Sequence, residues 1–227
     1  MADSTPAARP ADPADAWRGR RRRRDHGLKR EAVIRTAARA FDARGYHNTS
    51  LDDIATALGV TKPTVYYYVA SKEQLLFECF VAGLEPIRAA LRRAEQTPGS
   101  GRDRLREVVR DYAVAIASEY GWCMVRAEHQ DLGVELGAEV RALKSEIDRG
   151  IRRLLQAGVA DGSIAAHDPK LAAFAIAGAL NWIAHWFRAG RSLTPTQVAD
   201  AFVALLEHGL APRAKAARPA TVRRRRA

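Results

Sequence analysis

Three consecutive tyrosines, Tyr66, Tyr67 and Tyr68, lie between Lys62 and Lys72 in the segment TKPTVYYYVASKEQLL. A phenol hydroxyl can donate to a phosphate oxygen while its ring packs on a sugar or a thymine methyl group, and a lysine ammonium binds phosphate or a base edge. A hydrophobic core and a solvated face each have little use for such a row. The segment therefore predicts a contact with nucleic acid, although packing against the core is an equal alternative for Tyr68 taken alone.

Two short helices would position this row. Ser50 begins the first helix and forms an S-x-x-D capping box, and Gly59 ends that helix. Thr61 caps the second helix, which is expected to end near Val69. Two short helices around a tight glycine turn form a helix-turn-helix, here over residues 50–69, and the outer side of its second helix enters a DNA major groove.

The second helix divides into two sides. Val65 and Val69 lie four residues apart and are expected to face the core, which leaves Lys62, Pro63 and the first two tyrosines on the outer side. Pro63 is tolerated in the first turn because that amide has no partner within the helix.

Outside this segment, nearly every stretch repeats apolar residues at three- or four-residue spacing, and none alternates as a strand does. We therefore predict an all-α protein. The other expected helices cover about residues 28–44, 71–95, 102–119, 122–130, 134–160 and 169–190, with a last one from residue 195.

Most of the positive charge lies at the two ends of the chain. The net charge is +11, and residues 1–26 hold seven arginines against four aspartates while residues 213–227 hold seven cations and no acid. The part between them is close to neutral. Such arms suit phosphate-bearing partners, and solubility tails are the alternative interpretation.

Composition excludes several classes of protein. No run approaches the ~20 apolar residues that span a bilayer, and the arginine-rich start lacks the apolar segment of a secretion signal, so a cytoplasmic protein without membrane contact is expected. Only Cys79 and Cys123 are present, which excludes a disulfide framework and a zinc cluster and indicates two small buried residues. No metal and no cofactor are predicted.

The stretch GYHNTSLDDIATALGVTKPTVYYYVASKEQLL resembles the DNA-binding segment of the TetR family of bacterial transcriptional regulators. The family pattern runs Gly, Thr-Ser/Thr, Ile-Ala, Gly-Val-Ser/Thr, Tyr, then Ser-Lys-Glu and Leu, and the match covers residues 28 to about 88. The resemblance implies a ligand-released repressor that binds a palindromic operator in double-stranded DNA as a homodimer. It also implies a helical C-terminal domain that binds a small molecule and changes the separation of the two DNA-binding motifs.

The same resemblance implies the DNA contacts. Ser50 and Thr61 would be helix-start groups near phosphate. The groove face of the second helix would consist of Lys62, Pro63, Thr64, Tyr66 and Tyr67. Tyr68 and Lys72 would contact the DNA backbone. Asp52 departs from the polar or basic residue often found at its position. Its carboxylate either accepts from a cytosine amino group or complements the helix dipole, and the dipole is the favoured interpretation.

Two apolar helices near the C-terminus, beginning at Asp168-Pro169 and at Thr194-Pro195, provide the expected dimer interface. Small residues allow close approach, so the pair is expected to form a four-helix bundle with its copy in the partner. The alternative is that both helices only close the core of one subunit. The expected interface residues are Phe174, Ala175, Gly178, Ala179, Val198, Ala201, Phe202 and Leu205.

The stretch GALNWIAHWFRAGRSLTPTQVADAFVALLEHGL resembles the C-terminal end of TetR-type regulators that sense acyl-CoA thioesters, although WFRAGRS stands where these have an aromatic-Arg-Pro-Gly sequence. The resemblance implies an acyl-CoA or another hydrophobic small molecule as effector. Apolar residues would hold the acyl chain, and Arg110 or Arg126 would meet phosphate unless both are solvated side chains. The expected pocket residues are Arg110, Trp122, Arg126, His129, Trp182 and Trp186.

An enzyme is the other class considered, and none is predicted. Glu128 and His129 are adjacent and point apart on a helix, without a nucleophile motif or a phosphate-binding glycine loop, and His167 and His185 lack a spaced partner for metal. The alternatives to a specific regulator are therefore a non-specific nucleoid-type DNA-binding protein and, less favoured, a helical enzyme acting on thioesters.

The expected organisation has four parts. They are a basic disordered arm over 1–26, a DNA-binding domain over 27–87, an effector-binding and dimerisation domain over 88–211, and a basic tail over 212–227.

Overall fold

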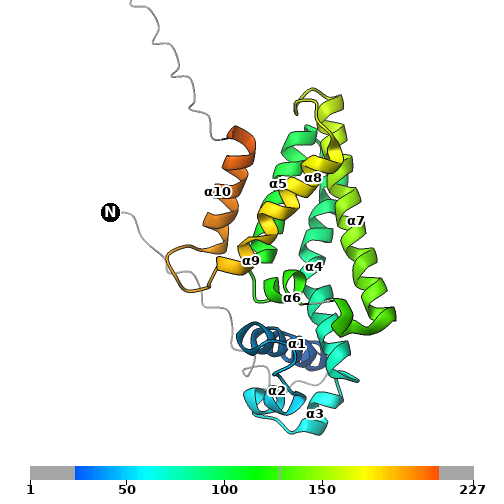
Figure 1. The fold of residues 1–227 in the computed structure, drawn as a ribbon, viewed down its shortest axis with the longest axis vertical. Coiled ribbons are helices and arrows are strands. Elements are labelled where there is room, and N and C mark those ends of the chain that lie inside the picture. Colours follow the sequence, from blue (N-terminus) through cyan, green and yellow to red (C-terminus); the bar gives the residue numbers. More distant parts are fainter. Residues whose placement is uncertain (1–23, 128, 210–227) are drawn as a thin grey trace, which may run out of the picture.

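The computed structural model describes residues 24–127 and 129–209, and every regular element within them is helical, which confirms the all-α class (Figure 1). The predicted arm and tail lie almost entirely outside the described residues. In none of the described helices is an apolar stretch long enough to cross a bilayer. In chain order the elements are α1 (Arg24–Arg44), α2 (Leu51–Leu58), α3 (Lys62–Tyr66), α4 (Lys72–Gln96), α5 (Gly101–Ile116), α6 (Gly121–Val125), the 3-10 helix η2 (His129–Leu132), α7 (Gly133–Ala160), α8 (Pro169–Asn181), α9 (Ile183–Trp186) and α10 (Pro195–His208).

The head, which we define as α1, α2, α3 and the first half of α4, lies at the bottom of Figure 1 and has its own apolar core. Phe41 and Ile54 are fully buried in it. Ser50 Oγ accepts from the Asp53 amide at 3.1 Å and Asp53 Oδ2 accepts from the Ser50 amide at 2.7 Å, which confirms the capping box. Gly59 ends α2 in the left-handed region, with φ of 68°.

The helix α4 belongs to both cores of the molecule. Leu75 and Leu76 are buried in the head core, whereas Ile87 and Leu91 are buried in the second core, which α4 forms with α5, α7, α8 and α10. Leu132, at the end of η2, packs into the head core from the other side of the expected domain boundary. The two cores therefore meet along a continuous helix, without a flexible linker between them.

In the second domain, α5 lies between α4 and α10, and α8 packs across α5 and α7 (Figure 1). Ion pairs hold α10 against α5, and two of them are also hydrogen bonds. Arg106 Nε donates to Glu207 Oε1 at 2.7 Å, and Arg110 Nε donates to Asp200 Oδ1 at 3.0 Å.

Several helix boundaries differ from expectation. α1 already includes Arg24, four residues before the expected start, because charged residues continue a helix without adding to its apolar stripe. α3 ends at Tyr66 and not near Val69. Its cap also differs, since the Thr61 hydroxyl bonds the Thr64 hydroxyl at 2.9 Å and makes no side-chain cap. The long helix expected over 169–190 is divided into α8 and α9.

Candidate nucleic-acid interface and effector cavity

The helix α3 presents an aromatic and cationic side to solvent. Val65 is fully buried in the head core, whereas Tyr66 is 48% and Tyr67 is 72% exposed. Lys62 and Pro63, in the first turn, are also exposed. The side chains expected to face a DNA groove are therefore open to a ligand in the free protein.

Tyr68 behaves differently from its two neighbours. It lies in the turn after α3, half-buried against the head core. Its ring centroid is 5.0 Å from that of His26 and 5.1 Å from that of Tyr67. Tyr68 therefore packs on the protein itself, in line with the alternative interpretation, and its contact with His26 also brings the start of α1 beside α3.

A cleft with a volume of about 460 Å³, which we call the reading cleft, lies between α2, α3 and the start of α4. It contains Ser50, Lys62, Tyr66 and Lys72 from the predicted contact set, together with Asp52. Residues from three elements thus converge on one surface that is open to solvent.

Lys62 is paired with an acid inside this cleft. Its Nζ donates to Asp52 Oδ2 at 2.6 Å, and the two side chains are 46% and 59% exposed. The hydrogen bond and the charge of Asp52 raise the pKa of Lys62, so the ammonium stays protonated. Sequence reasoning missed this pair because the partners are ten residues apart on different helices.

Lys72 connects the cleft to the loop before α2. Its Nζ donates to the His47 carbonyl at 3.4 Å and lies 4.2 Å from the centroid of the Tyr46 ring. His47 Nε2 in turn lies 3.0 Å from Asp131 Oδ1, in η2. The edge of the reading cleft therefore contacts the second domain, a link that the linear sequence does not reveal.

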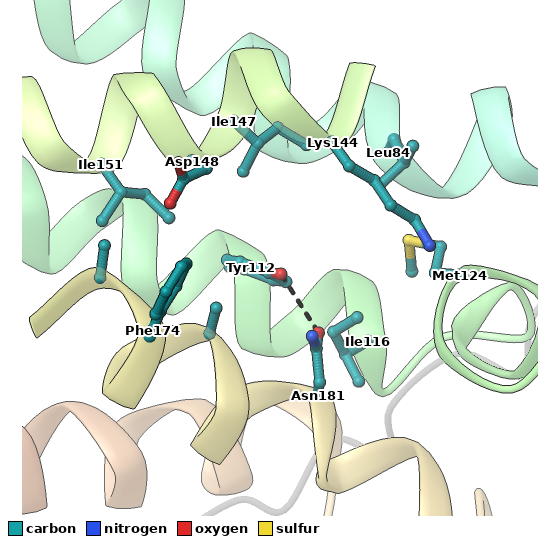
Figure 2. Close-up of a pocket in the computed structure, with 12 residues that line it drawn as sticks. Leu84, Tyr112, Ile116, Met124, Lys144, Ile147, Asp148, Ile151, Phe174 and Asn181 are labelled. Atoms are coloured by element: carbon teal, nitrogen blue, oxygen red, sulfur yellow. Dashed lines mark hydrogen bonds between the residues drawn. The ribbon is translucent and has the colours of Figure 1, made fainter. Parts of the chain in front are cut away.

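The second domain contains a cavity of about 210 Å³ between α4, α5, α6, α7 and α8 (Figure 2). Its polar lining consists of Tyr112, Lys144, Asp148 and Asn181. The remaining lining is apolar: Leu84, Ile116, Met124, Ile147, Ile151, Ala173, Phe174 and Ala177.

The polar groups of the cavity have distinct environments. The Tyr112 hydroxyl donates to Asn181 Oδ1 at 3.1 Å, and burial raises the pKa of Tyr112 to about 12. Burial lowers the pKa of Lys144 to about 8. Asp148 accepts from Arg152 Nε at 3.1 Å and lies 2.7 Å from a second nitrogen of that guanidinium. The cavity thus places a readily deprotonated amine and an amide within an apolar lining.

The arginines expected in the effector pocket do not line this cavity. Arg110 is engaged by Asp200 between α5 and α10, and Arg126 is exposed at the end of α6. The side chain of His129 lies outside the described residues. The charge and residue type of the arginines suggested a pocket, but Arg110 is paired with an acid at the surface.

The tryptophans expected there also lie elsewhere. Trp122 packs against the head core, with its ring centroid 6.5 Å from that of Phe41. Trp182 and Trp186 are exposed beyond the end of α8. The signal that points to the cavity is on α7, where Lys144 and Asp148 lie one turn apart on a largely apolar face.

The expected dimer interface is exposed in part. Val198 is only 2% exposed and packs inside its own subunit, so its assignment to a contact between subunits is wrong. Ala179 and Phe202 are half-buried. Leu171, which is not among the expected interface residues, is also exposed on α8. The expected residues that remain exposed are Phe174, Ala175, Gly178, Ala201 and Leu205.

No group of three or more histidine, cysteine or acidic side chains suited to a metal occurs among the residues that the structure describes. His167 Nδ1 lies 2.6 Å from a backbone carbonyl two residues earlier, and His185 stacks on Trp182 at 4.5 Å between ring centroids. Cys79 and Cys123 are both buried, as expected.

Comparison with known proteins gives matches in both parts of the chain. Residues 33–79 match the family described as bacterial regulatory proteins, tetR family, and residues 98–210 match the tetracyclin repressor-like C-terminal domain. The chain is 29% identical over 189 residues to the HTH-type transcriptional repressor KstR2 of Rhodococcus jostii strain RHA1, which covers 81% of this chain and 91% of that protein.

Solved structures match over the same extent. The structure of AibR in complex with isovaleryl coenzyme A and operator DNA has a TM-score of 0.67 and 30% identity, over 78% of this chain and 96% of that chain. The TetR family transcriptional regulator PfmR from Thermus thermophilus has a TM-score of 0.72 and 28% identity, over 79% of this chain and 99% of that chain. Both matches span the head and the second domain together.

Proposed function

The chain belongs to the TetR family of bacterial transcriptional regulators, and from this premise we propose that it is a repressor that binds a palindromic operator as a homodimer and is released by an effector in the cavity of the second domain. Members of this family bind operator DNA and small-molecule effectors. The observation that carries the proposal is the outward side of α3, where Lys62 and Tyr66 share the reading cleft with Lys72.

The reading cleft suits a major groove. The outer side of the second helix of a helix-turn-helix enters that groove, and phenol and ammonium groups donate to phosphate and base acceptors there. In this arrangement Lys62, Pro63, Thr64, Tyr66 and Tyr67 meet the groove, while Ser50, Thr61 and Lys72 lie near the phosphates. Tyr68 contributes its exposed edge and holds α3 against α1.

The exposed faces of α8 and α10 support a homodimer. Their apolar and small residues, including Phe174, Gly178 and Leu205, would be covered by the same faces of a second copy in a four-helix bundle. Such a dimer holds two heads at fixed separation. Because successive major grooves recur about every 34 Å along one face of B-DNA, a small rotation between subunits would misplace one head.

We propose an acyl-CoA thioester as the effector. AibR, a protein of the same fold, was solved with isovaleryl coenzyme A. The cavity of about 210 Å³ is smaller than the roughly 300 to 1,000 Å³ of ordinary ligand sites, which suits an acyl group whose nucleotide part remains outside. Lys144 and Asn181 would donate to the thioester carbonyl oxygen.

Release of DNA needs only a difference in effector affinity between two arrangements of the heads. α4 is common to both cores, and the His47–Asp131 contact joins the cleft edge to η2, so a change at the cavity has two routes to the head. An effector that prefers the arrangement with misplaced heads would lower operator affinity by linkage.

Two other functions are less well supported. A nucleoid-type protein would protect DNA without regard to sequence, whereas a regulator gives a discrete footprint on its operator. An enzyme would turn over thioesters, and we propose that this protein has no catalytic activity and acts on chromosomal DNA in the cytoplasm.

Thermal unfolding with a series of acyl-CoAs tests the effector assignment, because a ligand that binds the folded state raises the melting temperature. We expect a rise with one or more acyl-CoAs and none with free coenzyme A, and the same acyl-CoA should release operator DNA. Ala177→Leu, which fills the cavity, should abolish the rise, and Ala160→Leu, at an exposed position on α7, should keep it. If no acyl-CoA raises the melting temperature, this effector class is wrong.

A further inference from the structure

Asp52 is an acid on a surface proposed to meet a polyanion. It is the second residue of α2, it is exposed, and it lines the reading cleft beside Lys62 and Tyr66. Phosphate repels a carboxylate, and most groups on base edges are acceptors. The donors that a carboxylate meets in the major groove are the exocyclic amines, N4 of cytosine and N6 of adenine. Asp52 therefore has a favourable DNA partner only at a base edge.

The partner of Asp52 in the free protein further limits the DNA groups that Asp52 can contact. Lys62 Nζ, from the first residue of α3, donates to Asp52 Oδ2 at 2.6 Å. An ammonium has three N–H donors, so two remain for DNA after this bond. The ion pair thus presents an acceptor and a donor side by side, held between two helices, and it fixes a lysine side chain that would otherwise lose rotamer freedom on binding.

The edge of a G·C base pair has the complementary arrangement. Guanine O6 accepts from cytosine N4 within the base pair, so these atoms are about 2.9 Å apart, which is close to the separation of the charged atoms of Lys62 and Asp52. We propose that Asp52 and Lys62 act as one unit that reads a single G·C pair, with Asp52 accepting from cytosine N4 and Lys62 donating to guanine O6 and N7. The proposal rests on the proposed function, because it requires α3 to enter a major groove.

An A·T pair fits the same unit less well. It also places a donor, adenine N6, beside an acceptor, thymine O4. The thymine methyl group lies next to O4, however, so an ammonium at that position loses hydrating water to an apolar group and gains only one acceptor. Guanine instead offers two adjacent acceptors, O6 and N7. The arrangement therefore selects G·C over A·T.

The same pair should reduce binding to DNA of arbitrary sequence. Non-specific affinity comes from cations placed against phosphates. Asp52 engages the ammonium of Lys62 and adds a negative charge to the cleft, so neither residue favours a phosphate contact. Removing Asp52 should therefore increase binding to unrelated DNA while weakening the preference at one base pair.

Selection of bound duplexes from a randomised library, followed by sequencing, tests the proposal with full-length protein. The variants are Asp52→Ala and Lys62→Met, both at exposed positions outside the core, and the control is Asp42→Asn, which removes an exposed acid that does not line the cleft. We expect the wild-type motif to contain a G·C pair in each half-site, preferred about 5- to 150-fold over other pairs. Both variants should lose this preference at the same position and keep the rest of the motif, and the control should keep all of it.

Three results overturn the assignment while leaving the regulator intact: the two variants relax different positions, neither relaxes any position, or the shared position prefers A·T. A wild-type protein that enriches no motif overturns the proposed function as well, so the two failures are distinguishable. Thermal unfolding of each variant identifies any loss of fold, and direct titration of the wild-type motif against a copy with the G·C pair replaced gives the same comparison without selection.

Discussion

Burial gives one lysine of this protein an unusual chemistry. Lys144 lines the cavity of the second domain, and desolvation lowers its pKa from 10.5 to about 8. The cost of burying the ammonium is present at neutral pH and disappears as the group loses its proton. An amine of this kind can take up a proton again when a ligand brings a negative charge or a strong acceptor to it.

The titration of Lys144 should be visible in the pH dependence of the free energy of unfolding. The folded-state pKa lies below that of the unfolded chain, so between these values the unfolded state binds more protons and stability rises with pH. We expect the free energy of unfolding to increase by about 1 kcal/mol from pH 7 to pH 9 through this group. Lys144→Met should remove that increment in chemical denaturation, and Lys170→Met, on the exposed start of α8, should not. An unchanged pH dependence in Lys144→Met would show that the group titrates normally.

At the scale of elements, α8 combines an exposed apolar face with small residues. A Cβ atom placed at Gly178 meets nothing within 4 Å in its own subunit. Because Gly178 is also exposed, a larger side chain can extend into solvent in the monomer, and it would clash with a partner helix that approaches closely.

Gly178→Glu should thus dissociate the proposed homodimer without unfolding the subunit. Glu is a better helix former than Gly by roughly 1 kcal/mol at most, so α8 itself should not be weakened. Sedimentation equilibrium should give a dimer for the wild type and a monomer for this variant. Gly27→Glu is the control on α1, because a Cβ atom placed at Gly27 also meets nothing within 4 Å. A dimeric Gly178→Glu protein would place the subunit contact elsewhere.

The head was predictable because its signals are local. The capping box at Ser50, the glycine that ends α2 and the spacing of the two valines around α3 all lie within one continuous segment, and the structure contains each of them. The cavity was not predictable in the same way, since its lining comes from five helices far apart in the sequence. The Asp52–Lys62 pair and the burial of Val198 also depend on tertiary neighbours that no spacing along one helix reveals.

At the scale of the whole molecule, the start of α1 and the end of α10 lie at different places. The contact of His26 with Tyr67 and Tyr68 puts the start of α1 beside the reading side of α3. α10 ends at the top of Figure 1, away from α2 and α3 at the bottom. The start of α1 is therefore nearer to the reading cleft than the end of α10 is.

Truncation should separate the contributions of the two basic ends of the chain. Removing residues 213–227 should weaken binding to all DNA similarly and flatten the dependence of log affinity on log salt, and removing residues 1–23 should flatten it more. Each lost phosphate contact lowers the slope by about 0.9. Titrations at several salt concentrations, with operator and unrelated duplexes, measure both effects. An unchanged slope after either truncation would make that arm a solubility device.

The operator affinity of Tyr66→Ala tests most directly whether the outward side of α3 binds DNA. The Tyr66 side chain is exposed, whereas Val65 packs α3 against the head core, so the variant should keep its fold. Thermal unfolding can verify this. We predict a loss of roughly 1 to 3 kcal/mol in binding to the operator, and a similar loss for Lys62→Ala. Wild-type affinity in both folded variants would contradict the assignment of this surface to DNA.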